Sequence, residues 1–264
     1  MGFNGIGGYL SEPGMIPYWV VIIYFAVVLS FIFLWGKRTG ATRKFTTLDY
    51  VYIGIGAALA NVWEFYIGSF LNRAVPSGLT SFIDFAFWGR LFILLVVATI
   101  TRKVGTGMLS LAIFNLLSDI LHYGFSGEPI FTMYETLTYG LFLDIMIAIT
   151  GKHLFGLGYQ SQKKRLTDRK AGTTTSKGDS ASMNLFGLSG RNLALILAAV
   201  EGGIVGLMWA FPDPIFYSAF FKPLLYGAVV NWQKIIFGLV ASIPGDVILG
   251  ILAALAANRV ARVL

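Results

Sequence analysis

The stretch LDYVYIGIGAALANVWEFYIG, residues Leu48 to Gly68, decides the fold class of this chain. It is long and apolar enough to cross a bilayer, because a spanning helix needs about 20 predominantly apolar residues. Near its end, Glu64 lies among aromatic residues that include Trp63 and Tyr66. A carboxylate there is costly in lipid, at about 2.5 to 3.5 kcal/mol on insertion scales, so Glu64 is a candidate functional residue.

The composition of the whole chain is that of a membrane protein. Its 264 residues are 56% hydrophobic and 12% charged, whereas a soluble domain has about 25% charged residues. The mean hydropathy is +0.73. We therefore expect an all-α, polytopic membrane helix bundle. The predicted spans lie at about residues 17–36, 48–70, 82–101, 105–122, 132–150, 192–211 and 230–257.

The basic residues predict the orientation of these spans, because cytoplasmic loops collect lysine and arginine. With the N-terminus outside and the C-terminus in the cytoplasm, the outer loops hold only Arg73 and Lys222. Topology thus explains the net charge of +7, and we expect membrane lipid rather than nucleic acid as a partner. The inner loops hold Lys37, Arg38, Arg43, Lys44, Arg102, Lys103, Lys152, Lys163, Lys164, Arg165, Arg169, Lys170, Lys177, Arg191, Arg259 and Arg262.

Two parts of the chain are expected. Residues 1–46 would form an outer N-terminal segment, which lacks the basic region of a signal peptide, an additional membrane helix and a basic inner loop. Residues 47–264 would form a six-helix membrane core. The polar composition of residues of about 152–190 predicts a disordered basic linker on the cytoplasmic side.

Motifs for enzymatic chemistry are missing from the sequence. There is no GxxxxGK[ST] phosphate-binding loop, no nucleophile elbow and no HExxH pattern. The chain has no cysteine, which excludes disulfides and thiolate metal sites, and its only histidines are His122 and His153. We therefore expect no enzymatic activity, no metal and no cofactor.

Polar and aromatic residues of several spans gather at one predicted depth, in the outer half of the membrane. Asn115, Asp119 and His122 are spaced i, i+4, i+7, which places them on one face of the fourth span. Acids outnumber nearby bases, and an anionic, ring-lined cavity suits a cationic or hydrogen-bonding aromatic ligand. The candidate ligand-binding residues are Trp63, Glu64, Tyr66, Arg90, Asn115, Asp119, His122, Glu135, Tyr139, Trp209 and Trp232.

Several of these residues also have structural interpretations. Trp209 and Trp232 are compatible with an interfacial aromatic belt, and Arg90 with an ion pair to Glu64, Asp119 or Glu135. Asp84 and Glu128 are compatible with carboxylates at loop edges, and Asp49 and Asp144 with structural roles near the inner boundary. Glu201 and Asp246 fit either the pocket floor or contacts between helices. Gly202 and Gly206 form a small-residue face for close helix contact.

The chain resembles the substrate-binding S-components of energy-coupling-factor vitamin transporters, closest to the thiamin-precursor (hydroxymethylpyrimidine) branch. The resemblance covers residues 48–264. It rests on the opening stretch, on FWGRLFILLVVATITRKVGTGMLSLAIFNLLSDIL, on FSGEPIFTMYETLTYGLFLDIM, on AVEGGIVGLMW and on WQKIIFGLVASIPGDVILGILAALAANRV. It implies a six-helix core with an outward-facing vitamin pocket. It also implies that a membrane coupling protein and two ATPase subunits supply the energy.

The chain departs from that family in two ways. The segment from Pro17 to Trp35 is an additional helix. The alanine-xxx-alanine contact with the coupling subunit is replaced by small residues, so that Gly54, Ala57 and Ala58 are the candidate contact residues.

Three other functions fit parts of the sequence. A structural or assembly subunit of a larger membrane complex would use the acids for contacts between helices. A microbial-rhodopsin-like photoreceptor would need a retinal-bearing lysine near mid-membrane, whereas Lys234 is about one turn into the last span. An ion-coupled carrier would be expected to show an inverted repeat, and none is clear.

Overall fold

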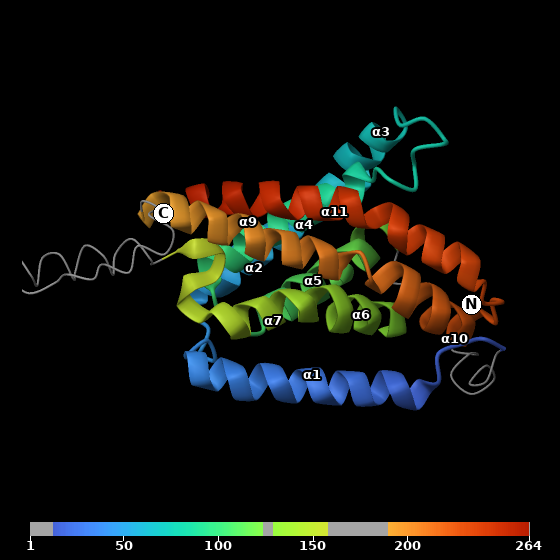
Figure 1. Cartoon of the computed structure of the whole chain (residues 1–264), viewed down its shortest axis with the longest axis horizontal. Coiled ribbons are helices and arrows are strands. Elements are labelled where there is room, and N and C mark those ends of the chain that lie inside the picture. The colour runs from blue at the N-terminus through green and yellow to red at the C-terminus, as the bar shows by residue number, and fades with distance from the viewer. Residues whose placement is uncertain (1–12, 124–128, 158–189, 264) are drawn as a thin grey trace, which may run out of the picture.

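The computed structural model describes residues 13–123, 129–157 and 190–263 (Figure 1). Glu128 and residues 158–189 of the predicted linker lie outside them. All regular elements within the described residues are helical. They are α1 (Tyr18–Thr39), α2 (Thr47–Val62), η1 (Trp63–Gly68), α3 (Ser69–Asn72), α4 (Phe85–Thr101), α5 (Thr106–Ser118), η2 (Asp119–Tyr123), α6 (Pro129–Glu135), η3 (Thr136–Gly140), α7 (Leu141–Thr150), η4 (Gly151–Gly156), α9 (Gly190–Trp209), η6 (Pro212–Phe221), α10 (Lys222–Tyr226) and α11 (Trp232–Val260).

In the described part of the chain, four helices are long and apolar enough to cross a membrane, as in a multi-pass membrane protein. They are Tyr18–Thr39, Thr47–Asn72, Asn192–Tyr226 and Trp232–Val260. These correspond to the first, second, sixth and seventh predicted spans. The other three predicted spans are helical too, as α4, as α5 with η2, and as α6 with η3 and α7, but they do not meet those limits of length and composition.

The sixth span is longer than expected. The sequence predicts that this apolar span ends at residue 211 and that Lys222 lies in an outer loop. That assignment was wrong, since η6 and α10 continue the helix to Tyr226. A turn at Ala210 and Phe211 separates α9 from η6, so Pro212 lies in the first turn of η6, where proline is tolerated. The helix ends at Gly227, whose positive φ of 62° suits glycine.

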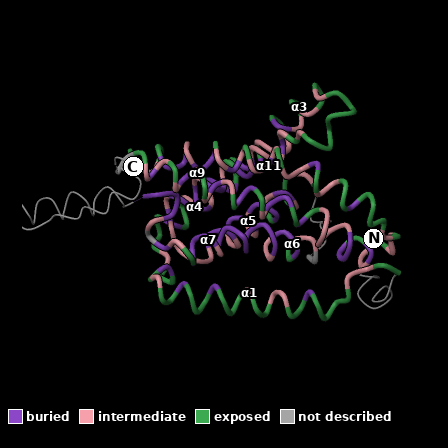
Figure 2. Tube along the Cα trace, viewed as in Figure 1, coloured by how far each residue is buried: buried purple, intermediate pink, exposed green. Residues whose placement is uncertain are grey.

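The helices pack into a bundle with a buried centre. Buried residues concentrate on α4, α5 and α7, whereas α1 is exposed along most of its length (Figure 2). α1 lies against α7, and α11 packs closely along α9. Glycine permits the second contact, because a Cβ on Gly206 would lie 2.1 Å from the carbonyl oxygen of Asp246.

Candidate ligand-binding site

A cavity of about 580 Å³ opens where α4 and α11 begin and where α9 continues into η6. Its walls also include η1, η3 and the loop of residues 80–84. Small-molecule sites in proteins have volumes of about 300 to 1,000 Å³. The cavity is therefore large enough for a molecule of one or two aromatic rings.

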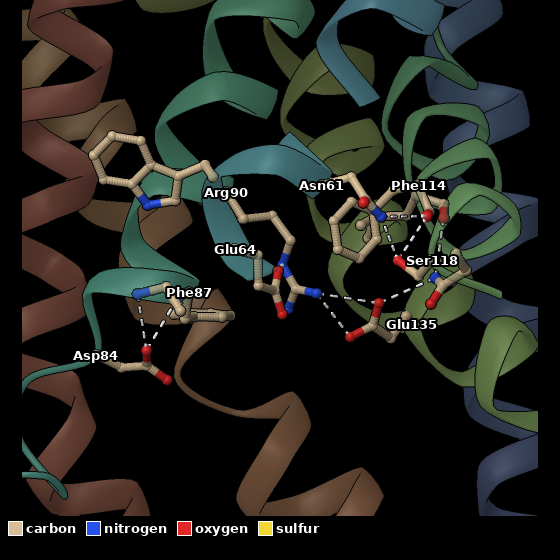
Figure 3. Close-up of polar contacts among 12 residues, drawn as sticks. Asn61, Glu64, Asp84, Phe87, Arg90, Phe114, Ser118 and Glu135 are labelled. Atoms are coloured by element: carbon tan, nitrogen blue, oxygen red, sulfur yellow. Dashed lines mark hydrogen bonds and ion pairs between the residues drawn. The ribbon is translucent and has the colours of Figure 1, made fainter. Parts of the chain in front are cut away.

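Arg90 lies at the inner wall of this cavity and is only 4% exposed. Its Nη1 donates to Glu135 Oε1 at 3.0 Å, and its Nε lies 3.1 Å from Glu64 Oε2 (Figure 3). Glu135 also accepts a hydrogen bond from Asn115 Nδ2 at 3.0 Å. Arg90 thus joins α4 to η1 and α6, and Asn115 adds α5 to the network.

Three aromatic rings surround the same guanidinium. Arg90 Cζ lies 5.4 Å from the ring centroid of Phe87, 5.0 Å from Phe114 and 5.5 Å from Tyr139. These distances are within the range of cation–π attraction. Arg90 is therefore fixed by both charge and ring contacts, and its orientation is well determined before any ligand binds.

The local structure of α2 and α4 explains how Glu64 reaches this point. Trp63 donates from Nε1 to the carbonyl oxygen of Phe85 at 2.8 Å. Its indole lies where a side chain of residue 89 would be, since a Cβ on Gly89 would come 1.7 Å from Trp63 Nε1. The backbone of η1 is a π-helix, a form that is frequent at functional sites. Glycine at position 89 thus lets η1 approach α4 and brings Glu64 to Arg90.

The other charged groups of the cavity are mainly acidic. Asp246 is buried and accepts from Trp88 Nε1 at 2.9 Å. Asp84 caps α4 by accepting from two backbone N–H groups. Five acids face three bases across the cavity: Glu64, Asp84, Glu135, Asp213 and Asp246 against Arg90, Lys222 and Lys234.

The structure brings five of the eleven candidate residues together in the cavity wall: Glu64, Arg90, Glu135, Tyr139 and Trp209. Asn115 lies behind them, against Glu135. The expected pairing of Arg90 with Glu64 and Glu135 is present, and no contact with Asp119 accompanies it among the described ion pairs.

The other five candidates lie outside the cavity wall, so the prediction of one shared pocket was too broad. His122 Nε2 lies 3.1 Å from Asn61 Oδ1, and the imidazole stacks on Phe65 at 3.9 Å between centroids, in a separate contact of η2 with α2 and η1. Asp119 and His122 belong to the π-helix η2, whose i→i+5 bonding shifts them from the expected α-helical face. The other three candidates are aromatic. Trp63 packs on α4, Tyr66 is exposed, and Trp232 donates a hydrogen bond to the carbonyl oxygen of Gly14.

Sequence reasoning missed Asp213, Lys222, Trp88 and residues 80–83, all of which line the cavity. Asp213 lies just beyond residue 211, where the predicted sixth span ended, and so was not among the candidates. An aspartate at the head of an apolar, aromatic run was the available signal. For Asp246 both interpretations hold, since it lines the cavity and also bonds to α4.

The remaining polar candidates have structural contacts elsewhere. Asp144 accepts from the backbone N–H groups of Gly105, Gly107 and Met108 at the start of α5. Asp49 pairs with Lys103. Glu201 accepts from the backbone N–H of Phe155 and does not line the cavity.

The three candidate coupling residues do not share one outer face. Ala57 is fully buried against the bundle, while Ala58 is exposed and a Cβ on Gly54 would meet nothing within 4 Å. Around the helix axis Ala57 lies about 60° from Gly54 and about 100° from Ala58, and its side chain faces the bundle rather than outward. Only Gly54 and Ala58 remain candidates for an outward contact.

Among the described residues, no group of three or more histidine, aspartate or glutamate side chains could hold a metal ion. Comparison with known proteins gives no relative: no family model, no curated protein and no solved structure matches the chain.

Proposed function

We propose that this chain is the substrate-binding membrane subunit of an uptake transporter for a small cationic or hydrogen-bonding aromatic molecule, with thiamin or hydroxymethylpyrimidine as the reference ligand. Separate coupling and ATPase subunits supply the energy. The observation that carries this proposal is the cavity of about 580 Å³, with five acids, three bases and aromatic walls. The resemblance to vitamin-transporter S-components supports the ligand class.

The charge balance of the cavity favours a cation. Arg90 is already engaged by Glu64 and Glu135, so its charge does not compensate the other acids. Asp246 is only 4% exposed, and a neutral indole N–H is its described hydrogen-bond partner. A positively charged ligand gains from these carboxylates, because an opposite charge is most favourable where water is excluded. The rings of the wall add cation–π attraction.

The basic residues support an outward opening. The cavity lies at the ends where α4 and α11 begin. Lys37, Arg38, Arg102 and Arg259 lie at the opposite ends, where α1, α4 and α11 finish. Because basic residues favour the cytoplasmic side, the ligand enters from outside. Gly54 and Ala58 on α2 are the proposed contact with the coupling protein.

A structural or assembly subunit remains a second candidate, and one observation favours it. The network of Arg90, Glu135 and Asn115 joins three helices within this chain, as polar contacts do in membrane bundles. If stabilising helices is the only role of these groups, replacing the acids changes stability and assembly but no ligand binds.

Calorimetric titration of the purified full-length chain in detergent tests the proposed function. Wild type binds thiamin or hydroxymethylpyrimidine with measurable affinity, and Glu64→Gln weakens binding about 10-fold or more, since a charge-assisted hydrogen bond contributes about 1.5 to 3 kcal/mol. Asp119→Asn is the matched control, because Asp119 is also an intramembrane acid but does not line the cavity. The proposal is wrong if wild type binds neither ligand, or if the two variants behave alike.

A further inference from the structure

The cavity wall contains buried polar atoms without a hydrogen-bond partner. Glu64 Oε2, Arg90 Nε and Trp209 Nε1 all belong to side chains that line it. About 90% or more of buried polar groups in proteins have a partner, so an exception calls for an explanation. An atom of this kind that no neighbouring protein group compensates points to a molecule that completes its bonding.

Two of the three atoms compensate each other. Arg90 Nε and Glu64 Oε2 lie 3.1 Å apart as an ion pair, although their geometry is not that of a hydrogen bond. Trp209 is different, because it is 1% exposed and its indole N–H has no hydrogen-bond partner in the part of the chain that the structure describes. The indole N–H can only donate, so the missing group is an acceptor.

Three other tryptophans near the cavity have N–H groups with a hydrogen-bond partner. Trp63 donates to the carbonyl oxygen of Phe85 at 2.8 Å, Trp88 to Asp246 at 2.9 Å, and Trp232 to the carbonyl oxygen of Gly14 at 2.9 Å. The unpaired indole of Trp209 is therefore a property of this position and not of tryptophan in this chain.

Trp209 is also close to the charged pair. Its ring lies 5.6 Å from Phe87 and 5.3 Å from Tyr139 between centroids. Arg90 lies over the same two rings, at 5.4 Å and 5.5 Å. Phe87 and Tyr139 thus connect the indole N–H to the carboxylate of Glu64 through one continuous section of wall.

We infer that Trp209 recognises a hydrogen-bond acceptor on the ligand, and that the ligand is an aromatic heterocycle or amide that carries both this acceptor and an amino or cationic group for the carboxylates. A simple aromatic amine provides only the second feature. The inference rests on the proposed binding function and adds a requirement to it: the ring nitrogen or carbonyl oxygen faces Trp209.

Two probes of the same shape test this requirement on the full chain by calorimetric titration. The first is 4-amino-5-hydroxymethyl-2-methylpyrimidine, and the second is 2-amino-4-methylbenzyl alcohol, which has the same substituents but no ring nitrogen. Wild type is expected to bind the pyrimidine about 10-fold more tightly. The second probe has no ring nitrogen, so it leaves the N–H of Trp209 without an acceptor. Trp209→Phe reduces this ratio to about 1, and the control Trp232→Phe keeps the wild-type ratio.

The possible results separate the inference from the proposed function. If Trp209→Phe keeps the wild-type ratio, the acceptor assignment to Trp209 is wrong while the binding function stands. Equal affinity of wild type for both probes also overturns the assignment. This comparison needs no variant, so it holds even if Trp209→Phe does not fold. If wild type binds neither probe, the proposed function fails for this ligand class and the inference fails with it.

Discussion

Glu64 and Glu135 both contact Arg90, and their replacement is expected to have different consequences. Glu135→Gln should destabilise the fold more, and Glu64→Gln should weaken ligand binding more. Glu135 is 5% exposed and receives two contacts from Arg90 Nη1, at 3.0 and 3.3 Å, and one from Asn115 at 3.0 Å. Breaking a buried ion pair by removing one partner costs about 3 to 5 kcal/mol. Glu135→Gln is expected at the lower end, about 3 kcal/mol, because the amide keeps one acceptor oxygen.

Glu64→Gln costs much less stability. The side chain of Glu64 is 24% exposed, and its Oε2 contacts Arg90 without hydrogen-bond geometry. Because the Glu64 carboxyl group is only partly enclosed and a glutamine keeps one oxygen towards Arg90, a cost of about 1 kcal/mol is expected, at the top of the range for exposed pairs and below that for buried pairs. With about 2 to 4 °C of melting temperature per kcal/mol, Glu135→Gln lowers Tm by about 6 to 12 °C and Glu64→Gln by about 2 to 4 °C.

The assay is thermal unfolding of the ligand-free chain in detergent, followed by intrinsic fluorescence, with the binding titration of the same samples beside it. Glu64→Gln should have the larger effect on binding and the smaller effect on Tm. The reasoning is refuted if Glu64→Gln lowers Tm as much as Glu135→Gln does, because then Glu64 is a structural partner of Arg90 rather than a group available to ligand.

Two further predictions concern the scaffold. Asp144→Ala leaves three backbone N–H groups at the start of α5, one buried and two partly buried, without their acceptor. The free energy of unfolding is expected to fall by about 3 kcal/mol, measured through the Tm of the ligand-free chain. A loss below about 1 kcal/mol contradicts this role of Asp144. Gly206→Ala places a Cβ 2.1 Å from a carbonyl oxygen of α11, whereas Gly54→Ala meets nothing within 4 Å. Gly206→Ala is expected to lower Tm, whereas Gly54→Ala leaves Tm equal or slightly higher because alanine favours the helix. Equal effects of the two variants would show that α9 and α11 do not pack as described.

Hydropathy was sufficient to locate the helices, because each predicted span is a long apolar run that can satisfy its backbone only as a helix. It failed at the end of the sixth span, which was predicted to end at residue 211, before Pro212, whereas the structure is helical to Tyr226. Hydropathy cannot detect that a proline falls in a first turn, where the missing N–H has no consequence. The end of the sixth span therefore depended on where each proline falls relative to the start of a helix, which the hydropathy pattern does not show.

The site was only partly predictable for a related reason. Glu64, Arg90 and Glu135 were found because charged residues in apolar spans are rare and costly. His122 was assigned to the wrong place because α-helical spacing was assumed through a segment that is a π-helix. Asp213 was missed because its position in the cavity depends on the helix of residues 212–226. Residue type identified the candidates, but register decided which of them meet.

The cavity itself can be tested most directly by protection of a single cysteine. The chain has no cysteine, so Ser218→Cys in the cavity wall provides one reactive thiol, and Ser77→Cys in the exposed loop is the control. A membrane-impermeant maleimide added to whole cells is expected to label both variants, and saturating thiamin or hydroxymethylpyrimidine protects only the cysteine at position 218. If that cysteine is labelled only after the cells are permeabilised, the cavity does not face outward. If its labelling rate is unchanged with either ligand present, the cavity does not bind these ligands. Either result would contradict an outward-facing ligand cavity.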